Sequence, residues 1–288
     1  MDDGLVLVRH MAEGLGRLGF AAGILEWARP FLAPMYAWTA AAPGGAVLPL
    51  PSVVRLTLTW LVDQLRAGGR VVVCGQPLAS MGELFRADAK GEDNLVVLGG
   101  WCCQGATGPR RPDGSPSRCP LRRPPGSSGG QIPARRFRHQ SATKLSVQLF
   151  APQGPLRQGV VKLTGGTDNQ GNAYIVQKML TTKMPVAAIL MQLATDLHQA
   201  GLWLELNWLP REENTEADAL TNGDFSGFDP QLRVPVSWAE VDLGVVQKLL
   251  TAEAEFRDKL GELKAARRQG VPEGPARKRK RERSTWGV

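Results

Sequence analysis

The sequence predicts an α/β protein: a mixed sheet flanked by helices, with a mostly helical N-terminal segment ahead of it. Two observations predict this class. Short apolar runs with period-2 alternation, such as Leu202–Leu209, follow longer runs of helical periodicity, such as Pro185–Gly201. The hydrophobic fraction of 43% is also sufficient for a packed core. A basic stretch at 104–144, rich in Pro, Gly and Ser, interrupts the pattern and is expected to be disordered.

Upstream of this stretch, apolar spacing and turn residues define the elements. In order, we expect one or two helices over 5–29 that end near Pro30, a loop over 42–51, a helix over 52–69 that ends near Gly68, a buried strand over 70–75, and a hairpin with strands Leu84–Lys90 and Leu95–Trp101.

Downstream of the basic stretch, strands and helices alternate. We expect strands over 145–150 and 159–168, helices over 169–182 and 185–201, a strand over 202–209, a capped helix over 214–222, and a final amphipathic helix over 256–270 before a basic tail. Pro185 suits a first helical turn and Gly201 a C-terminal cap. Trp208 shares one side of its strand with three leucines, so we expect it in the core.

The charge limits the classes of partner and compartment. A net charge of +8 and a pI of about 9.6 favour a polyanionic partner, although much of the charge lies in 110–144 and 259–283. Few cysteines and histidines argue against zinc and against a disulfide scaffold. The acidic start does not resemble a signal peptide, and prolines within 30–54 exclude a membrane helix there. We therefore expect a nuclear or cytoplasmic protein with no membrane contact.

Three aspartates lie within the first hairpin strand or at the ends of elements: Asp88, Asp168 and Asp218. Carboxylates are the ligands that Mg²⁺ or Mn²⁺ prefers, and two such ions can activate water for phosphodiester cleavage. Each aspartate also has a structural interpretation. Asp88 could be a solvated strand residue, Asp168 the cap of the helix after it, and Asp218 a residue facing water.

Residues 163–222 resemble the C-terminal half of the ribonuclease H domains that are fused to reverse transcriptases. The motifs are "TDNQGNAYIVQKM" and "WLPREENTEADALTN", and "FRADAKGEDNLVVLGGW" is similar to the opening hairpin of that family. Upstream, "GRLGFAAGILEWARPFLAPMYAW" resembles the segment after the polymerase palm in retroelement reverse transcriptases, especially DIRS-like ones. The resemblance implies an RNase H-like fold, a degenerate C-terminal fragment of a polyprotein, and a polymerase portion of that polyprotein as a possible partner.

The resemblance further implies that Asp88, Asp168 and Asp218 are catalytic and bind Mg²⁺ or Mn²⁺. It implies an RNA–DNA hybrid or duplex as partner, and the predicted nucleic-acid contacts are Asn169, Gln170, Arg211 and the tail residues Arg277, Lys278, Arg279, Lys280 and Arg281. The predicted units are a thumb- or connection-like helical segment over 1–76, an RNase H-like domain over 77–228, and a C-terminal extension over 229–288.

Two residues of the family pattern are missing. The fourth metal ligand is normally a glutamate on a helix after the hairpin, but the only acid between Cys102 and Asp168 is Asp113. The histidine of the last loop is replaced by a stretch that contains Arg211. The basic stretch at 104–144 is either a true insert or the product of a shifted reading frame. Two hypotheses stay open, a weakened RNA–DNA hybrid nuclease and a non-catalytic nucleic-acid-binding remnant.

Overall fold

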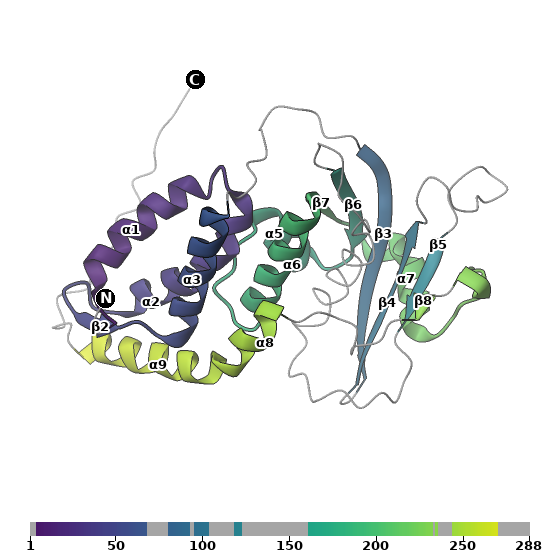
Figure 1. The fold of residues 1–288 in the computed structure, drawn as a ribbon. Coiled ribbons are helices and arrows are strands. Elements are labelled where there is room, and N and C mark those ends of the chain that lie inside the picture. The colour runs from purple at the N-terminus through teal and green to yellow at the C-terminus, as the bar shows by residue number, and fades with distance from the viewer. Residues whose placement is uncertain are drawn as a thin grey trace, which may run out of the picture.

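A layer of helices and a mixed sheet lie on either side of one buried helix, α6 (Val186–Ala200), as Figure 1 shows. The computed structural model describes residues 4–67, 80–92, 95–103, 118–122, 161–232, 234–235 and 244–269. Within these ranges, no helix combines the length and the apolar character that crossing a membrane requires.

The N-terminal part is a small helical unit. In chain order its elements are β1 (Leu5–Leu7), α1 (Val8–Ala21), the 3-10 turn η1 (Glu26–Ala28), α2 (Arg29–Ala41), β2 (Val47–Pro49) and α3 (Ser52–Arg66). Strands β1 and β2 pair with each other in antiparallel orientation. The expected helix end near Pro30 is wrong. Pro30 lies in the first turn of α2, where a missing N–H costs no hydrogen bond. The expected loop over 42–51 contains β2.

In the described part of the chain, the sheet has six strands: β3 (Ser80–Glu92), β4 (Leu95–Cys103), β5 (Arg118–Arg122), β6 (Val161–Thr167), β7 (Leu202–Trp208) and β8 (Val234–Pro235). Their order across the sheet is β7-β6-β3-β4-β5-β8. The pairs β3–β4 and β4–β5 are antiparallel, whereas β3–β6, β6–β7 and β5–β8 are parallel. The predicted fold class, a mixed α/β sheet flanked by helices, is confirmed.

Strand β5 corrects the expectation of a structureless segment over 104–144. Residues 118–122 pair with β4, and the register sets Cys102 opposite Cys119. The backbone groups along that edge of β4 need partners, and a strand can supply them whatever its side chains are. The rest of 104–144 lies outside the described residues, as do the strands expected over 70–75 and 145–150.

The two faces of the sheet carry different helices. Helix α7 (Thr215–Asn222) packs against β3 and β4, and a Cβ on Gly99 would meet the side chain of Thr221. Helices α5 (Gln170–Lys178) and α6 lie by β6 and β7. There Phe85 approaches Gly165 so closely that a Cβ would lie 2.2 Å from its ring. Asp88 pairs with Gly99 and therefore belongs to the face that α7 covers.

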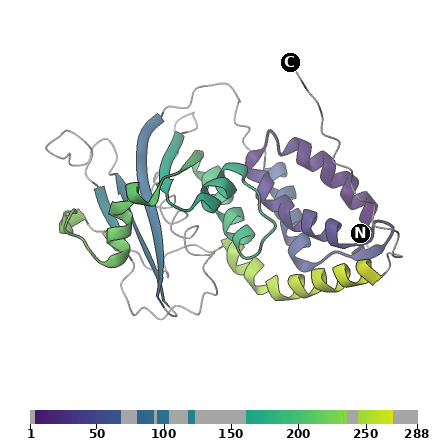
Figure 2. The same cartoon turned by 180° about the vertical axis from the view of Figure 1, so that it is seen from behind.

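Helix α6 is buried on nearly all sides and joins two cores. Its residues Ala187, Ala188, Met191 and Ala194 belong to the core of the helical unit. Leu190, Leu193 and Leu197 belong to the core of the sheet. The C-terminal helices α8 (Gly244–Thr251) and α9 (Glu253–Gln269) return to the helical unit, where they contact α6 and α2, and the view from behind shows α9 along its edge (Figure 2).

Candidate active site

Two of the predicted aspartates lie on neighbouring strands that run in parallel. Asp88 is in β3, and Asp168 follows the last residue of β6. The register pairs Arg86 with Gly166, and each aspartate lies two residues further along its own chain. Asp88 and Asp168 therefore come at the same level of the sheet and on the same side of it.

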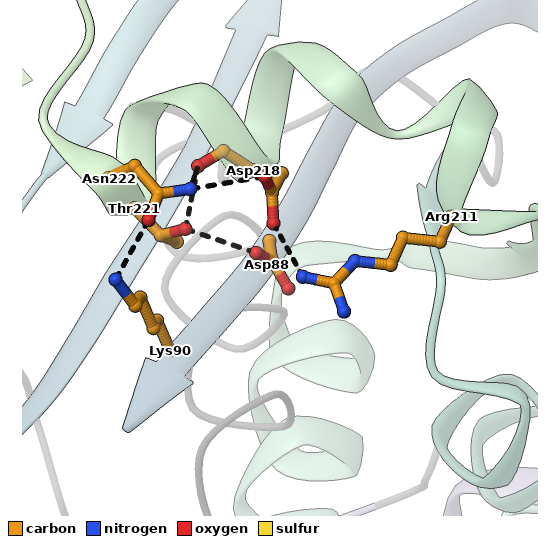
Figure 3. A network of polar contacts seen from close by, with 6 residues as sticks. All are labelled: Asp88, Lys90, Arg211, Asp218, Thr221 and Asn222. Atoms are coloured by element: carbon orange, nitrogen blue, oxygen red, sulfur yellow. Dashed lines mark hydrogen bonds and ion pairs between the residues drawn. The ribbon is translucent and has the colours of Figure 1, made fainter. Parts of the chain in front are cut away.

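Asp218 reaches this region from α7. Its Oδ1 accepts a hydrogen bond from Arg211 at 3.1 Å, and its Oδ2 accepts one from Asn222 at 3.1 Å. The Thr221 hydroxyl lies 3.2 Å from Oδ2 of Asp88, so α7 and β3 are connected at the site. Figure 3 shows the carboxylates of Asp88 and Asp218 and the guanidinium of Arg211 pointing toward one another.

Arg211 is bonded to Asp218 and senses the charge of the other two aspartates. Its pKa is raised above the ordinary value, first by the hydrogen bond to Asp218 and then by the negative charges of Asp218, Asp168 and Asp88. Figure 3 shows the carboxylates of Asp88 and Asp218 beside this guanidinium, and the sheet register puts Asp168 level with Asp88. The structure thus places the three predicted aspartates at one end of β3 and β6 and beside α7, with Arg211 bonded to Asp218.

The structural interpretations of Asp88 and Asp168 do not hold. Asn169 caps α5, with Oδ1 accepting from the backbone of Asn172 at 3.0 Å, so Asp168 is not the cap. Asp88 is only 6% exposed and is not a solvated strand residue. Asp218 is half-buried and is bonded by Arg211 and Asn222.

Trp208 corrects another expectation, because it is 48% exposed and not in the core. It is the last residue of β7 and pairs with Thr167, the residue before Asp168. Its indole Nε1 donates to the carbonyl oxygen of Asp168 at 3.0 Å. An indole can be held in this way while its ring remains in contact with solvent. The strand alternation holds for Leu202, Leu204 and Leu206 and ends at the carboxylate edge.

Four residues at or beside this site were not predicted from the sequence: Lys90, Arg86, Thr221 and Asn222. Thr221 and Asn222 follow Asp218 by one helical turn, a spacing that puts them beside it, and Lys90 donates to Asn222 Oδ1 at 2.8 Å. Arg86 precedes Asp88 by two residues and so shares its face. Its guanidinium binds Glu83 and donates to the carbonyl oxygen of Glu213, in the turn η2 (Arg211–Glu213). The spacings could have identified these neighbours, although not their contacts.

The other predicted nucleic-acid contacts have separate outcomes. Asn169 is used as a helix cap, and Gln170 is exposed at the start of α5. Arg211 lies in the carboxylate cluster. The tail residues 277–281 lie outside the described residues, so their contacts stay a prediction.

The chemistry of the cluster suits a hard divalent ion, because its donors are carboxylate oxygens. Among the residues that the structure describes, however, no three or more His, Cys, Asp or Glu side chains are arranged to hold one metal ion. Mg²⁺ is commonly bound through one or two carboxylates with water in its remaining positions. The residues present therefore fit an ion held by one or two carboxylates, with Asp88, Asp168 and Asp218 as the candidates.

Comparisons with known proteins give two similar solved structures. One is RNase H1 from the halophilic archaeon Halobacterium salinarum NRC-1, with 17% identity and a TM-score of 0.36 over 51% of this chain and 99% of that one. The other is an N-terminal RNase H domain from Mycobacterium tuberculosis, solved as a fusion with maltose-binding protein, with 16% identity and a TM-score of 0.35 over 50% and 92% of the two chains. No family model and no curated protein matches the sequence.

Proposed function

We propose that this chain contains an RNase H-type domain that hydrolyses RNA in RNA–DNA hybrids with weakened activity. One observation supports the proposal: the register of β3 and β6 puts Asp88 level with Asp168, and Thr221 of α7 connects Asp88 to the helix that carries Asp218. Carboxylates from separate elements repel one another, so their convergence favours a site that attracts cations.

The residues of the cluster have distinct roles in this proposal. Asp88, Asp168 and Asp218 present oxygen ligands to Mg²⁺ or Mn²⁺. Bound divalent ions supply an activated water and stabilise the leaving oxygen of a phosphodiester. Thr221 and Asn222 hold the carboxylates of Asp88 and Asp218 in place. Trp208 offers an exposed aromatic ring beside Asp168, a surface on which a base or sugar can pack.

The weakened activity follows from the missing fourth ligand. The resemblance implies a glutamate after the hairpin, and the sequence has no acid other than Asp113 between Cys102 and Asp168. A site with one carboxylate fewer has less negative charge with which to hold two divalent ions. We expect at least one of the ions to bind weakly.

The retroelement origin is part of the same proposal and is supported by the sequence motifs. "TDN" and "NTEADAL" occur in the family's order, and the segment upstream of the hairpin resembles the one that follows a reverse transcriptase palm. Under this proposal, the polymerase portion of the same polyprotein is a possible partner, and a hybrid is the nucleic acid that the domain meets.

A cleavage assay on a labelled RNA–DNA hybrid tests the function. We expect the wild type to cut the RNA strand in Mg²⁺ or Mn²⁺. Asp168→Asn should lower the rate by more than the roughly 10–100-fold that loss of an outer-shell partner costs a metal site. Asp258→Asn, on the exposed face of α9, is the matched control and should cut like the wild type. Equal rates for Asp168→Asn and the wild type would contradict the proposal.

A second candidate is a nucleic-acid-binding remnant without catalysis. The absence of a three-ligand metal group within the described ranges favours it, as does a guanidinium bonded to one of the three carboxylates. This candidate predicts no cleavage with either metal. It also predicts duplex binding that weakens steeply with salt, since each neutralised phosphate adds about 0.9 to the logarithmic slope. Fluorescence anisotropy at several salt concentrations measures this slope.

A further inference from the structure

The position of Arg211 within the carboxylate cluster has a consequence for metal binding. Its Nη2 lies 3.1 Å from Asp218 Oδ1, and the charges of Asp168 and Asp88 also act on it. A planar guanidinium is a permanent cation with several N–H donors. It therefore supplies some of the positive charge that a cluster of three aspartates requires.

The backbone that carries Arg211 is fixed beside the site at several points. The backbone N–H of Leu209 donates to Thr167 at 2.9 Å, which ties the end of β7 to the end of β6. Arg86 of β3 donates to the carbonyl oxygen of Glu213. The backbone N–H of Asn214 donates to the carbonyl oxygen of Arg211 at 3.0 Å and closes the turn. The side chain of Arg211 is thus presented to the carboxylates by a turn that is attached to both strands bearing Asp88 and Asp168.

The side chain itself is not locked in place. It is 76% exposed, and it donates a hydrogen bond to Asp218 from the solvent side. Exposed ion pairs contribute little free energy because water solvates both partners. A stronger cation can therefore displace the guanidinium from Asp218 at small cost.

From this geometry we propose that Arg211 is the resident counter-cation of the carboxylate cluster and competes with a hard divalent ion for Asp218. In the absence of metal it offsets the repulsion among the aspartates. When Mg²⁺ or Mn²⁺ binds, like charge drives the guanidinium toward solvent, where a phosphate can accept its hydrogen bonds. The inference rests on the metal-binding role given to the aspartates in the proposed function.

Mn²⁺ titration followed by isothermal calorimetry on the full chain tests this competition, with three variants. Arg211→Gln removes the charge and should bind Mn²⁺ about ten-fold more tightly, the size expected for one unit charge acting on a divalent ion a few Å away near solvent. Arg211→Lys keeps the charge and should stay within about two-fold of the wild type. Arg9→Gln is the matched control, because Arg9 is 77% exposed and lies 3.1 Å from a single carboxylate, Glu13.

The outcomes separate the competition from a merely structural contact and from the nuclease proposal. Equal affinities for the wild type and Arg211→Gln, equal effects of the Gln and Lys variants, or no Mn²⁺ binding by any variant would overturn the inference. Tighter binding by Arg211→Gln supports it even if no variant cuts a hybrid, an outcome in which only the nuclease proposal fails. Hybrid cleavage with unchanged Mn²⁺ affinity leaves the nuclease proposal standing alone. Thermal unfolding of each variant verifies that the fold is intact.

Discussion

Individual residues at the carboxylate edge depend on contacts between elements. Thr221 is buried, and its hydroxyl lies 3.2 Å from Asp88 Oδ2 and 2.8 Å from the carbonyl oxygen of Asp218. Asp88 is itself nearly buried, so the loss of this donor removes a hydrogen bond that water cannot easily replace. Thr221 thereby couples α7 to β3 at the candidate site.

Thr221→Val should lower the free energy of unfolding by about 0.5–1.5 kcal/mol, because it removes the hydroxyl proton that Asp88 Oδ2 and the carbonyl oxygen of Asp218 share. Thr57→Val is the control. Thr57 is equally buried, but its hydroxyl bonds only to carbonyl oxygens of its own helix, Val53 and Val54. Those carbonyls keep their helical partners, so the control should change stability by no more than about 0.5 kcal/mol. Urea unfolding at pH 7 compares the two, and equal losses would argue against the coupling.

At the scale of elements, the sheet depends on how closely β6 can approach β3. Gly165 of β6 faces Phe85 of β3, and a Cβ there would lie 2.2 Å from the aromatic ring. Gly165 therefore serves packing, because it lets the large ring of Phe85 fill the core of the sheet.

Gly165→Ala should destabilise the fold by about 1–3 kcal/mol, because the added methyl group must displace Phe85 or the strand. Gly16→Ala has the opposite expectation. Gly16 is exposed in α1, and a Cβ added there would have no atom within 4 Å. The alanine should therefore stabilise the helix by roughly 0.5–1 kcal/mol. Unfolding midpoints in urea measure both effects. A neutral Gly165→Ala would show that β3 and β6 are less tightly packed than the structure has them.

Much of the element order could be predicted, because periodicity and caps are local. The hairpin, α6 with Gly201 at its left-handed cap, and α7 followed from such patterns. Strand β5 could not be predicted, because its pairing is set by the open edge of β4 and not by its own Arg- and Pro-containing sequence. Trp208 was wrongly predicted to be in the core. The alternation of apolar residues continues to this last residue of the strand, but its side chain is exposed to solvent.

The residues of the candidate site could also be predicted only in part from the sequence. The motifs identified Asp88, Asp168 and Asp218, since each occupies a recognisable place in its element. The hydrogen-bond partners of these aspartates depend on the strand register and on the path of the loops. Thr221, for example, contacts Asp88 although 133 residues separate them in the sequence. The sequence predicts Arg211 as a nucleic-acid contact in the last loop, but its bond to Asp218 required the fold.

At the scale of the whole molecule, α6 connects the helical unit to the sheet through its two buried faces. The helical unit therefore supports the face of the sheet opposite to α7. The domain boundaries near 76 and 228 stay a prediction, but α8 and α9 pack on the helical unit and contribute Leu249, Phe256 and Leu263 to its core. The carboxylate edge lies on the sheet, with β3, β6 and α7 bringing its residues from distant parts of the chain.

The most direct test of this convergence is paramagnetic broadening of backbone amide resonances by a substoichiometric amount of Mn²⁺. A single ion near the cluster should broaden the amides around residues 88, 168 and 218 together, since paramagnetic relaxation falls steeply with distance. Asp168→Asn should reduce all three effects at once. Broadening confined to one of these segments, or found only in other parts of the chain, would contradict a common cation site at the edge of the sheet.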